Sequence, residues 1–383
     1  MKAVKFIIIP VLAVAIIACL FIPFFSAGAE EPFVIACFSD PHHDYGVADA
    51  EPFVRPSSQK AVEYVNTLTK GGADLVMIGG DITGRYTTWT DERIKNLMDA
   101  SYSLFAGAAK DGKALVATGN HDCEPTVHSD TLEINSNDYT KYIEKAMGKP
   151  KAEFYSSDIS EDHAFPFDEQ LCFRYEVNGF EVLGLNTPQG DRRSIKQIGH
   201  NGLYIEQVEW LEKQLKSIGK DETVFLMCHY SPDTIHTVTS LFDPVDETVY
   251  NACRVKMKEL MEEYSNVIYL YGHVHTEAVQ ALASTEESVQ PFSDNENSAL
   301  ACHMGSLGYY KDFYNPGNLG AEDPKVVQVM MIYVYSDRIV FAEHNTGEMP
   351  ANSGDYELEE YTVERNLADN FSKKVSLFQK IFG

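Results

Sequence analysis

Short apolar segments alternate along the chain with longer stretches in which apolar residues recur every three or four positions. The short segments lack polar alternation, so they predict strands that are buried on both faces. The longer stretches predict amphipathic helices. The predicted buried strands are residues 33–38, 75–78, 114–117, 223–227 and 267–270. The predicted helices are residues 57–68, 91–109, 138–147, 205–215 and 255–264.

The chain also contains patterns typical of hairpins and loops. An Asn-Gly pair at 178–179 lies between apolar runs at 172–177 and 180–185, and this pair is typical of a two-residue hairpin turn. A second hairpin is predicted within residues 326–343, and the polar segment 284–298 is predicted to be a loop. Strands that alternate with helices indicate an α/β fold.

Composition and charge narrow the class of protein. The 383 residues are 44% apolar and 23% charged, which is near the average for a soluble globular protein and excludes a disordered chain, a collagen and a multi-span membrane protein. The 31 basic and 57 acidic residues give a net charge of −26. A surface this acidic repels nucleic acid phosphates, so we expect no nucleic acid partner.

The first 29 residues form a separate segment. Lys2 and Lys5 precede an uncharged run at 6–25. Small residues follow the run, a pattern typical of a secretory signal peptide cleaved after Ala29. An uncleaved membrane anchor is an alternative, because the run is long enough to span a bilayer. Lipidation at Cys19 is a second alternative. Cleavage would remove two lysines and no acid, leaving a net charge of −28 on an exported or cell-surface protein.

The remainder is expected to be one domain, residues 30–346, followed by an acidic C-terminal extension, residues 347–383, that ends in a short amphipathic segment. Six cysteines lie outside the leader, and none form a CxxC pair, so a zinc site built from thiolates is not supported. Disulfides are permitted in an exported protein, but the cysteines within apolar runs are expected to be free, buried thiols.

Polar side chains that can bind metal follow each of the five predicted buried strands. In open α/β sheets, ligands bind outside the carboxyl ends of the strands, so these side chains are expected to meet at one rim. Glycines at 80, 119 and 272 precede several of them, where the chain must turn sharply. The candidate ligands are Asp40, His42, Asp81, Asn120, His229, His273 and His275. By contrast, His43 and His303 are expected to be hydrogen-bonded surface histidines.

The residue types indicate what such a site would hold. Nitrogen and oxygen ligands without a thiolate suit Fe, Mn or Zn. Seven ligands exceed the four that one zinc ion prefers, so two metal ions that share a bridging carboxylate are expected. Two ions roughly 3.5–4 Å apart can clamp an in-line displacement at phosphorus, and they lower the pKa of bound water toward ~7.

The order of these motifs along the chain resembles the signature of the calcineurin-like metallophosphoesterases. The motifs are Asp40-x-His42, Gly80-Asp81, Gly119-Asn120-His121-Asp122, His229 and Gly272-His273-x-His275. The resemblance implies an α/β fold, a four-layer sandwich of mixed β-sheets flanked by helices. It also implies roles for the residues. Asp40, His42 and His275 would hold one metal ion, Asn120, His229 and His273 the other, and Asp81 both. His121 would stabilise or protonate the leaving oxygen, oriented by Asp122.

Departures from related patterns indicate the branch of the family. Gly84 stands where purple acid phosphatases carry a tyrosine ligand, and Arg85 matches an arginine of protein Ser/Thr phosphatases whose flanking residues are absent here. The pattern is closer to the secreted phosphodiesterase and phosphatase branch, which keeps the Asp-x-His and Gly-His-x-His motifs. Whether Arg85, or Arg192 and Arg193, contact phosphate is left open by the sequence.

The expected function is therefore a metal-dependent phosphoric ester hydrolase in which a metal-bound hydroxide attacks phosphorus. The sequence does not separate phosphodiester from phosphomonoester substrates, and it does not give the oligomeric state. Contact with a membrane is expected only through an uncleaved leader. Two alternatives remain open: a catalytically degenerate binding or scaffold protein with the same fold, and a nuclease of the same family.

Overall fold

A computed structural model describes most of the chain between residues 31 and 363. The described ranges are 31–43, 54–83, 91–122, 136–159, 168–188, 202–237, 247–274, 289–295, 297–307, 327–346 and 360–363. The chain divides into two units, Met1–Phe33 and Val34–Gly383. Apart from residues 31–33, all described residues belong to the second unit, so the fold described below is that of the second unit.

One β-sheet contains six strands within the described ranges, in the order β15-β14-β13-β1-β2-β3. Neighbours β1, β2 and β3 run parallel, whereas β13, β14 and β15 pair antiparallel. The strands are β1 (Phe33–Phe38), β2 (Leu75–Ile78), β3 (Ala114–Val116), β13 (Gln328–Val334), β14 (Ile339–Asn345) and β15 (Glu360–Val363).

A second sheet contains seven described strands in the order β11-β12-β10-β8-β6-β5-β4. The four central strands β12, β10, β8 and β6 run parallel, and the outer strands pair antiparallel with their neighbours. The strands are β4 (Ala152–Tyr155), β5 (Gln170–Val177), β6 (Phe180–Leu185), β8 (Val224–Cys228), β10 (Val267–Tyr271), β11 (Val289–Pro291) and β12 (Leu300–His303). Short strands β7 (Gly202–Leu203) and β9 (His236–Thr237) pair separately.

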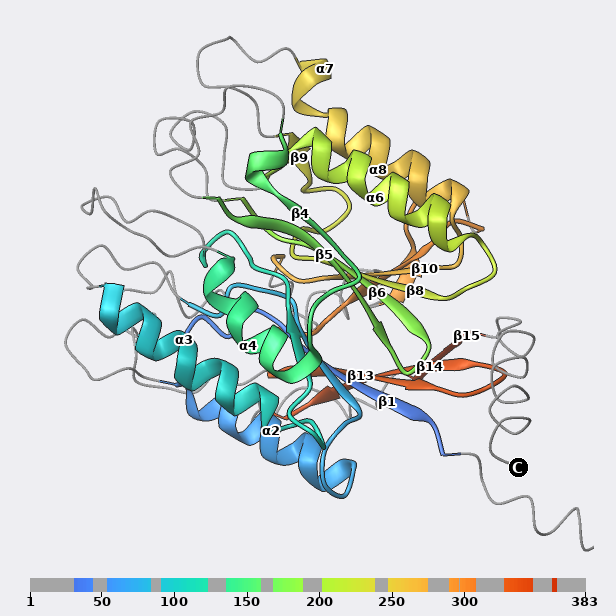
Figure 1. The fold of residues 1–383 in the computed structure, drawn as a ribbon. Coiled ribbons are helices and arrows are strands. Elements are labelled where there is room, and N and C mark those ends of the chain that lie inside the picture. Colours follow the sequence, from blue (N-terminus) through green and yellow to red (C-terminus); the bar gives the residue numbers. More distant parts are fainter. Residues whose placement is uncertain are drawn as a thin grey trace, which may run out of the picture. The chain divides into compact units, whose positions relative to one another are not determined.

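Helices cover the outer face of each sheet, which gives four layers (Figure 1). Helices α2 (Pro56–Leu68), α3 (Asp91–Ala106) and α4 (Asn137–Met147) flank the six-stranded sheet. Helices α6 (Ile205–Ile218) and α8 (Ala252–Glu263) flank the seven-stranded sheet. The short elements η1 (Ser156–Asp158) and α7 (Glu247–Tyr250) complete the set described. The predicted four-layer sandwich of mixed sheets and flanking helices is therefore confirmed.

Burial explains why these segments form these elements. All side chains of β2, β8 and β10 are buried, as expected for apolar runs without alternation. On α6, Val208, Leu211 and Leu215 recur at helical spacing and are fully buried in the cluster beneath the seven-stranded sheet. Each such side chain contributes ~1.5–3 kcal/mol relative to leaving it exposed.

The predicted hairpin between β5 and β6 is confirmed, turn included. Asn178 and Gly179 have φ angles of 51° and 84°, so both lie in the left-handed region that a type I′ turn requires. Val177 and Phe180 pair directly across the turn. The Asn-Gly pair therefore fixes the register of these two strands.

Six of the described strands, all short, were not indicated by the sequence pattern: β4, β7, β9, β11, β12 and β15. Part of the segment predicted as a loop, residues 284–298, forms β11, which pairs antiparallel with β12. Strand β15 lies within the predicted C-terminal extension and pairs with β14. Both lie at the edge of a sheet. Edge strands are often short and polar, so their hydrophobic pattern is weak and a neighbouring strand decides their conformation.

The cysteines fit the expectation of free thiols where they are described. Five free, buried cysteines are present in the described ranges: Cys37, Cys172, Cys228, Cys253 and Cys302. Burial raises the pKa of the Cys228 thiol to about 11. The remaining cysteines, Cys19 and Cys123, lie outside the described residues. No described helix is both long and apolar enough to span a bilayer, and the apolar run at 6–25 lies outside those residues.

Candidate metal centre

The candidate ligands follow the carboxyl ends of strands from both sheets. Asp40 and His42 follow β1, and Asp81 follows β2. His229 follows β8 and His273 follows β10, in the other sheet. The backbone N–H of His273 donates to the Asp40 carboxylate, 3.0 Å from Oδ2. The ends of the two sheets are thereby joined at one rim, as the sequence predicted.

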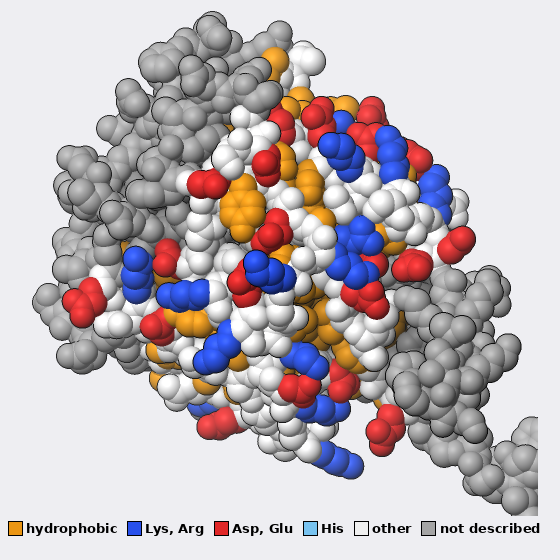
Figure 2. Space-filling model, viewed as in Figure 1, with side chains coloured by type: hydrophobic (Ala, Val, Ile, Leu, Met, Phe, Trp, Pro, Cys, Tyr) orange, Lys and Arg blue, Asp and Glu red, His pale blue; other side chains and the backbone are white. Residues whose placement is uncertain are grey.

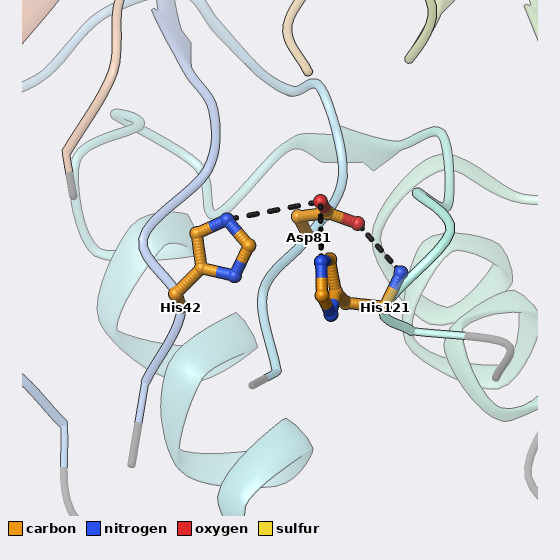
Figure 3. Close-up of side chains that lie close together, drawn as sticks. All are labelled: His42, Asp81 and His121. Carbon is orange, nitrogen blue, oxygen red and sulfur yellow. Dashed lines mark hydrogen bonds and ion pairs between the residues drawn. The ribbon is translucent and has the colours of Figure 1, made fainter. Parts of the chain in front are cut away.

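Asp81 lies at the centre of this rim. Its Oδ2 atom is 3.1 Å from His229 Nε2, 3.7 Å from His42 Nε2 and 3.9 Å from His121 Nε2. Figure 3 shows the His42 ring to the left of the Asp81 carboxylate and the His121 ring below it, each from a different segment of the chain. The other oxygen, Oδ1, accepts the backbone N–H of His121 at 2.8 Å. Oδ2 therefore faces three imidazole nitrogens.

Two groups of side chains around Asp81 have the spacing of metal ligands. His42, Asp81 and His121 form one group, and Asp81, His229 and His273 form the other. Within each group the candidate ligand atoms lie within 4.8 Å of one another. Because Asp81 belongs to both groups, a single carboxylate can serve two neighbouring ions.

The donor atoms fit a metal ion. Asp81 Oδ2 and Asn120 Oδ1 are buried and have no partner of ordinary hydrogen-bond geometry among the described residues. Leaving such acceptors unsatisfied is costly, whereas a cation would satisfy both. His229 Nδ1 lies 2.6 Å from the Gly79 carbonyl oxygen. Donation of Nδ1–H to that carbonyl leaves the Nε2 lone pair facing Asp81, as a metal-binding histidine requires.

In the protein without metal, the Asp81 carboxylate and the histidines around it shift one another's pKa. Burial opposes the charge on Asp81, but His229, His121 and His42 hold the pKa of that carboxyl well below its usual range. Burial likewise opposes protonation of His229, but the Asp81 and Asp40 carboxylates raise its pKa to about 9. Without metal, a protonated His229 would therefore pair with ionised Asp81. A bound cation would compete with that proton.

Four of the candidate ligands adopt a left-handed backbone that is unusual for residues other than glycine. The φ angles are 53° for Asp40, 43° for His42, 51° for Asp81 and 70° for His273. Each such residue costs on the order of 1–3 kcal/mol, and such strain clusters at functional sites because the surroundings must enforce it. The turns after β1, β2 and β10 therefore aim these side chains at the rim at an energetic cost.

Glycines make the close approach of the loops feasible. A Cβ atom at Gly119 would collide with the backbone nitrogen and carboxylate of Asp81. At Gly272 it would collide with Ser39 Oγ and the Asp40 carboxylate. The sequence-based inference that these two positions need glycine therefore has a steric cause, namely space for the neighbouring ligand.

The family resemblance implied that Asp122 orients the His121 ring, but the shortest described hydrogen bonds of its carboxylate go to backbone N–H groups. Its carboxylate accepts the backbone N–H groups of Gly119 and Thr83 at 2.9 Å and 3.1 Å. Within the described residues, no hydrogen bond joins it to the His121 imidazole. Burial and the charge of Asp81 raise the pKa of Asp122 to about 6. Asp122 instead fixes the loop that carries Asn120 and His121, because its carboxylate is held by backbone donors of two loops.

The structure brings together most of the predicted site. Asp40, His42, Asp81, His121, His229 and His273 share the contacts given above, and Asn120 lies between Gly119 and His121 in the same loop. His275 lies outside the described residues, as do Arg85, Arg192 and Arg193. The assignment of each ligand to a particular ion stays a prediction.

Several residues beside the site were missed or misjudged from the sequence. Ser39 is fully buried and its hydroxyl donates to Asp40 Oδ2 at 2.6 Å; its position at the end of an apolar strand gave no indication of this contact. His43 and His303 are buried rather than on the surface. Burial and the charge of Arg55 lower the pKa of His43 to about 3. The expectation for these histidines was wrong because both rings pack inside the fold, His43 on Phe105 of α3 and His303 on Tyr271 of β10.

Family comparison agrees with this fold and site. A model of the calcineurin-like phosphoesterases matches residues 33–277. The chain therefore belongs to the calcineurin-like phosphoesterase family.

One curated relative is the probable glycerophosphodiester phosphodiesterase GpdQ of Arcobacter nitrofigilis, 26% identical over 215 residues. The match covers 55% of this chain and 60% of that relative, so the chain spans less than two thirds of it.

Similar solved structures include purple acid phosphatase PPD1 from yellow lupin (Lupinus luteus) seeds and Vps29 from Chaetomium thermophilum. The lupin enzyme has 15% identity and a TM-score of 0.42, over 89% of this chain and 55% of that chain. Vps29 has 9% identity and a TM-score of 0.32, over 87% of this chain and 95% of that chain.

Proposed function

We propose that this chain is an exported two-metal phosphoesterase that hydrolyses small phosphodiesters or phosphomonoesters. The observation that carries the proposal is Asp81 Oδ2, a buried carboxylate oxygen within 3.1–3.9 Å of imidazole nitrogens from three separate segments. A phosphoesterase of this family needs such a carboxylate to hold its metal ions, and the surrounding protein offers Oδ2 no ordinary hydrogen bond among the described residues.

The proposed ligand sets follow the predicted roles. Asp40, His42 and His275 would hold one ion, Asn120, His229 and His273 the other, and Asp81 both. The participation of Asp81 in two ligand groups supports two ions over one. When bound, the ions supply positive charge beside the phosphoryl oxygens and lower the pKa of bound water. Fe, Mn and Zn all suit this set of donors.

His121 is proposed to act on the substrate. Its side chain is 20% exposed, whereas the side chains of His42 and His229 are 3% and 0% exposed. An imidazole that reaches solvent from the edge of the ligand cluster can contact the leaving oxygen and donate a proton to it. The hydrogen bond from its backbone N–H to Asp81 Oδ1 holds it beside the candidate metal ligands.

The substrate is proposed to be a small phosphoester. Similarity to a glycerophosphodiester phosphodiesterase supports a diester. The net charge of −26 argues against a nucleic acid polyanion. On the face shown in Figure 2, basic and acidic side chains are interspersed over the described surface, whereas a polyanion would need a basic groove.

Metal analysis combined with a paired hydrolysis assay tests the function. The purified protein would be analysed for metal content and assayed with 4-nitrophenyl phosphate and bis(4-nitrophenyl) phosphate. Two ions per chain with hydrolysis of at least one ester are expected, and the faster ester gives the preference. Protein that binds no metal and hydrolyses neither ester would support the scaffold alternative. Salt-sensitive retention of DNA would support the nuclease alternative.

Export is a separate part of the proposal, because it depends on the leader alone. Mass spectrometry of protein recovered outside the producing cells should find an N-terminus at Glu30. Membrane-bound protein that retains residues 1–29 would support the uncleaved anchor, and a lipid on Cys19 would support lipidation. In either of those cases the protein would contact a membrane through the leader.

A further inference from the structure

Arg55 directly precedes α2 and contacts the segment that carries His42. Its Nε–H donates to the His42 carbonyl oxygen at 3.1 Å, and its backbone N–H donates to His43 Nδ1 at 3.2 Å. We propose that Arg55 is a positioning residue, which holds His42 in the conformation that binds metal. This inference rests on the proposed function, because it assumes that His42 is a metal ligand.

The backbone of His42 needs to be held from outside. Its φ angle of 43° is unfavourable for a residue with a Cβ atom, and such a conformation persists only where the surroundings enforce it. The N–H of His42 donates to the Asp81 carbonyl oxygen at 3.0 Å, and its carbonyl accepts from Arg55. Both backbone polar groups of His42 are therefore fixed, one by the neighbouring ligand loop and one by Arg55.

His43 gives Arg55 a second hold on the same segment. His43 is fully buried, and its N–H donates to the Ile82 carbonyl oxygen at 2.9 Å. Its ring stacks on Phe105 of α3, with centroids 5.8 Å apart and planes at 19°. The hydrogen bond from the backbone N–H of Arg55 to His43 Nδ1 therefore connects the start of α2 to a ring that is fixed by its packing on Phe105. Arg55 thus contacts two consecutive residues, His42 and His43, of the segment that follows β1.

The local structure of α2 does not explain an arginine at this position. Arg55 is the N-cap residue, and its side chain makes no capping hydrogen bond. Helix N-caps favour Ser, Thr, Asp or Asn, and a positive charge at a helix N-terminus interacts unfavourably with the helix dipole. A residue that breaks a local rule without a local gain is often kept for the site it serves. The contact with His42 supplies that reason.

Arg55 is itself anchored by the helix that it precedes. Its carbonyl oxygen accepts the N–H groups of Ser58 and Gln59 at 3.1 Å and 3.3 Å, and Pro56 fixes the first helical turn. A guanidinium stays protonated at any pH at which the protein is folded. The contact with His42 is therefore expected to hold over the whole working pH range.

Metal affinity measured by chelator competition tests the proposal directly. Arg55→Met keeps most of the side-chain length and the backbone N–H that contacts His43, but it removes the guanidinium donor to His42. We therefore expect affinity for one ion to fall ~10–100-fold, as for loss of an outer-shell contact. Arg55→Lys, which keeps a donor and a charge, should recover part of that loss. Arg174→Met is the matched control, because Arg174 is also largely buried but pairs with Glu181 in the second sheet. It should lower the melting temperature and leave metal affinity unchanged.

A double-mutant cycle separates positioning from general destabilisation. If Arg55 acts through His42, Arg55→Met should weaken metal binding no further in a His42→Ala background. A further, additive loss would overturn the proposal, as would folded Arg55→Met protein with wild-type affinity. Arg55→Ala is a second donor-free variant should Arg55→Met fold poorly. Wild-type protein that binds no metal would overturn the proposed function as well, whereas equal binding by wild type and variant overturns this inference alone.

Discussion

His229 and Asp81 form a fully buried pair that joins the two sheets, with His229 Nε2 3.1 Å from Asp81 Oδ2. Asp81 follows β2 of one sheet and His229 follows β8 of the other. On its far side, the His229 ring is fixed by the Gly79 carbonyl oxygen, 2.6 Å from Nδ1. Nδ1 of this ring contacts a backbone carbonyl and Nε2 faces the Asp81 carboxylate. The protonation state of His229 therefore links the stability of the protein to its affinity for metal.

The stability of the metal-free protein should therefore depend on pH. The pKa of His229 is raised from 6.5 to about 9. A group whose pKa is raised on folding contributes stability that is fully present below its unfolded value and is lost as pH rises through its folded value. We expect the free energy of unfolding of chelator-treated protein to fall between pH 6.5 and about 9, by at most ~1.4 kcal/mol per pH unit.

The variant His229→Gln is the control, because it cannot titrate and should show a flatter profile in denaturant unfolding. Other shifted groups act outside this range. Asp122 has a pKa of about 6 and burial lowers the pKa of His43 and His236, whereas burial raises the pKa of the Cys228 thiol to about 11. Metal affinity should change in the opposite direction and rise with pH, because the ion displaces the His229 proton. Equal slopes for wild type and His229→Gln would contradict the assignment.

The substitution Asp81→Asn should remove most of the bound metal. Asparagine keeps one oxygen for the backbone N–H of His121 but loses the charge that would hold two cations. We expect kcat/KM to fall by roughly 10³-fold or more, equivalent to ~4 kcal/mol of transition-state stabilisation. Asp74→Asn is a suitable control, because Asp74 lies at the opposite end of β2, where it accepts the Val34 N–H and pairs with Lys110. Full activity and metal content in Asp81→Asn would refute a bridging role.

The substitution His121→Ala should lower the rate and retain the metal. Loss of a proton donor typically costs ~10²–10⁴-fold, and the loss should grow as the leaving group becomes more basic. A series of aryl phosphoesters with increasing leaving-group pKa measures this slope. Loss of metal from the variant would instead make His121 a ligand, for which its place beside His42 and Asp81 provides the geometry.

The substitution Asp122→Asn tests the role that the structure gives to this carboxylate. One amide NH₂ would face a backbone N–H of Gly119 or Thr83 that now donates to a carboxylate oxygen. We expect the free energy of unfolding to fall by ~1–3 kcal/mol through the unsatisfied donor. The leaving-group dependence should stay that of the wild type. A dependence like that of His121→Ala would show that Asp122 acts through the His121 ring.

Much of the fold was predictable because the pattern of apolar residues indicates which segments are buried. The central strands were located to within a residue, since an apolar run such as β8 can be satisfied only in the interior. Helix ends were less accurate. The last turn of α6 extends to Ile218, beyond the predicted end, and Gly219 follows it with a φ angle of 89°. Strands such as β11 were missed because their partners, not their own residues, decide their conformation.

The sequence by itself determined the chemistry of the candidate site: the nitrogen and oxygen side chains, their positions after buried strands, and the family. Only the tertiary structure decided which groups meet. The backbone of His273 bonds to Asp40 across 233 residues, the Asp122 carboxylate binds two loops rather than a ring, and Arg55 holds His42. A local pattern specifies where a strand ends and which side chains come next, but hydrogen-bond partners depend on how distant segments pack.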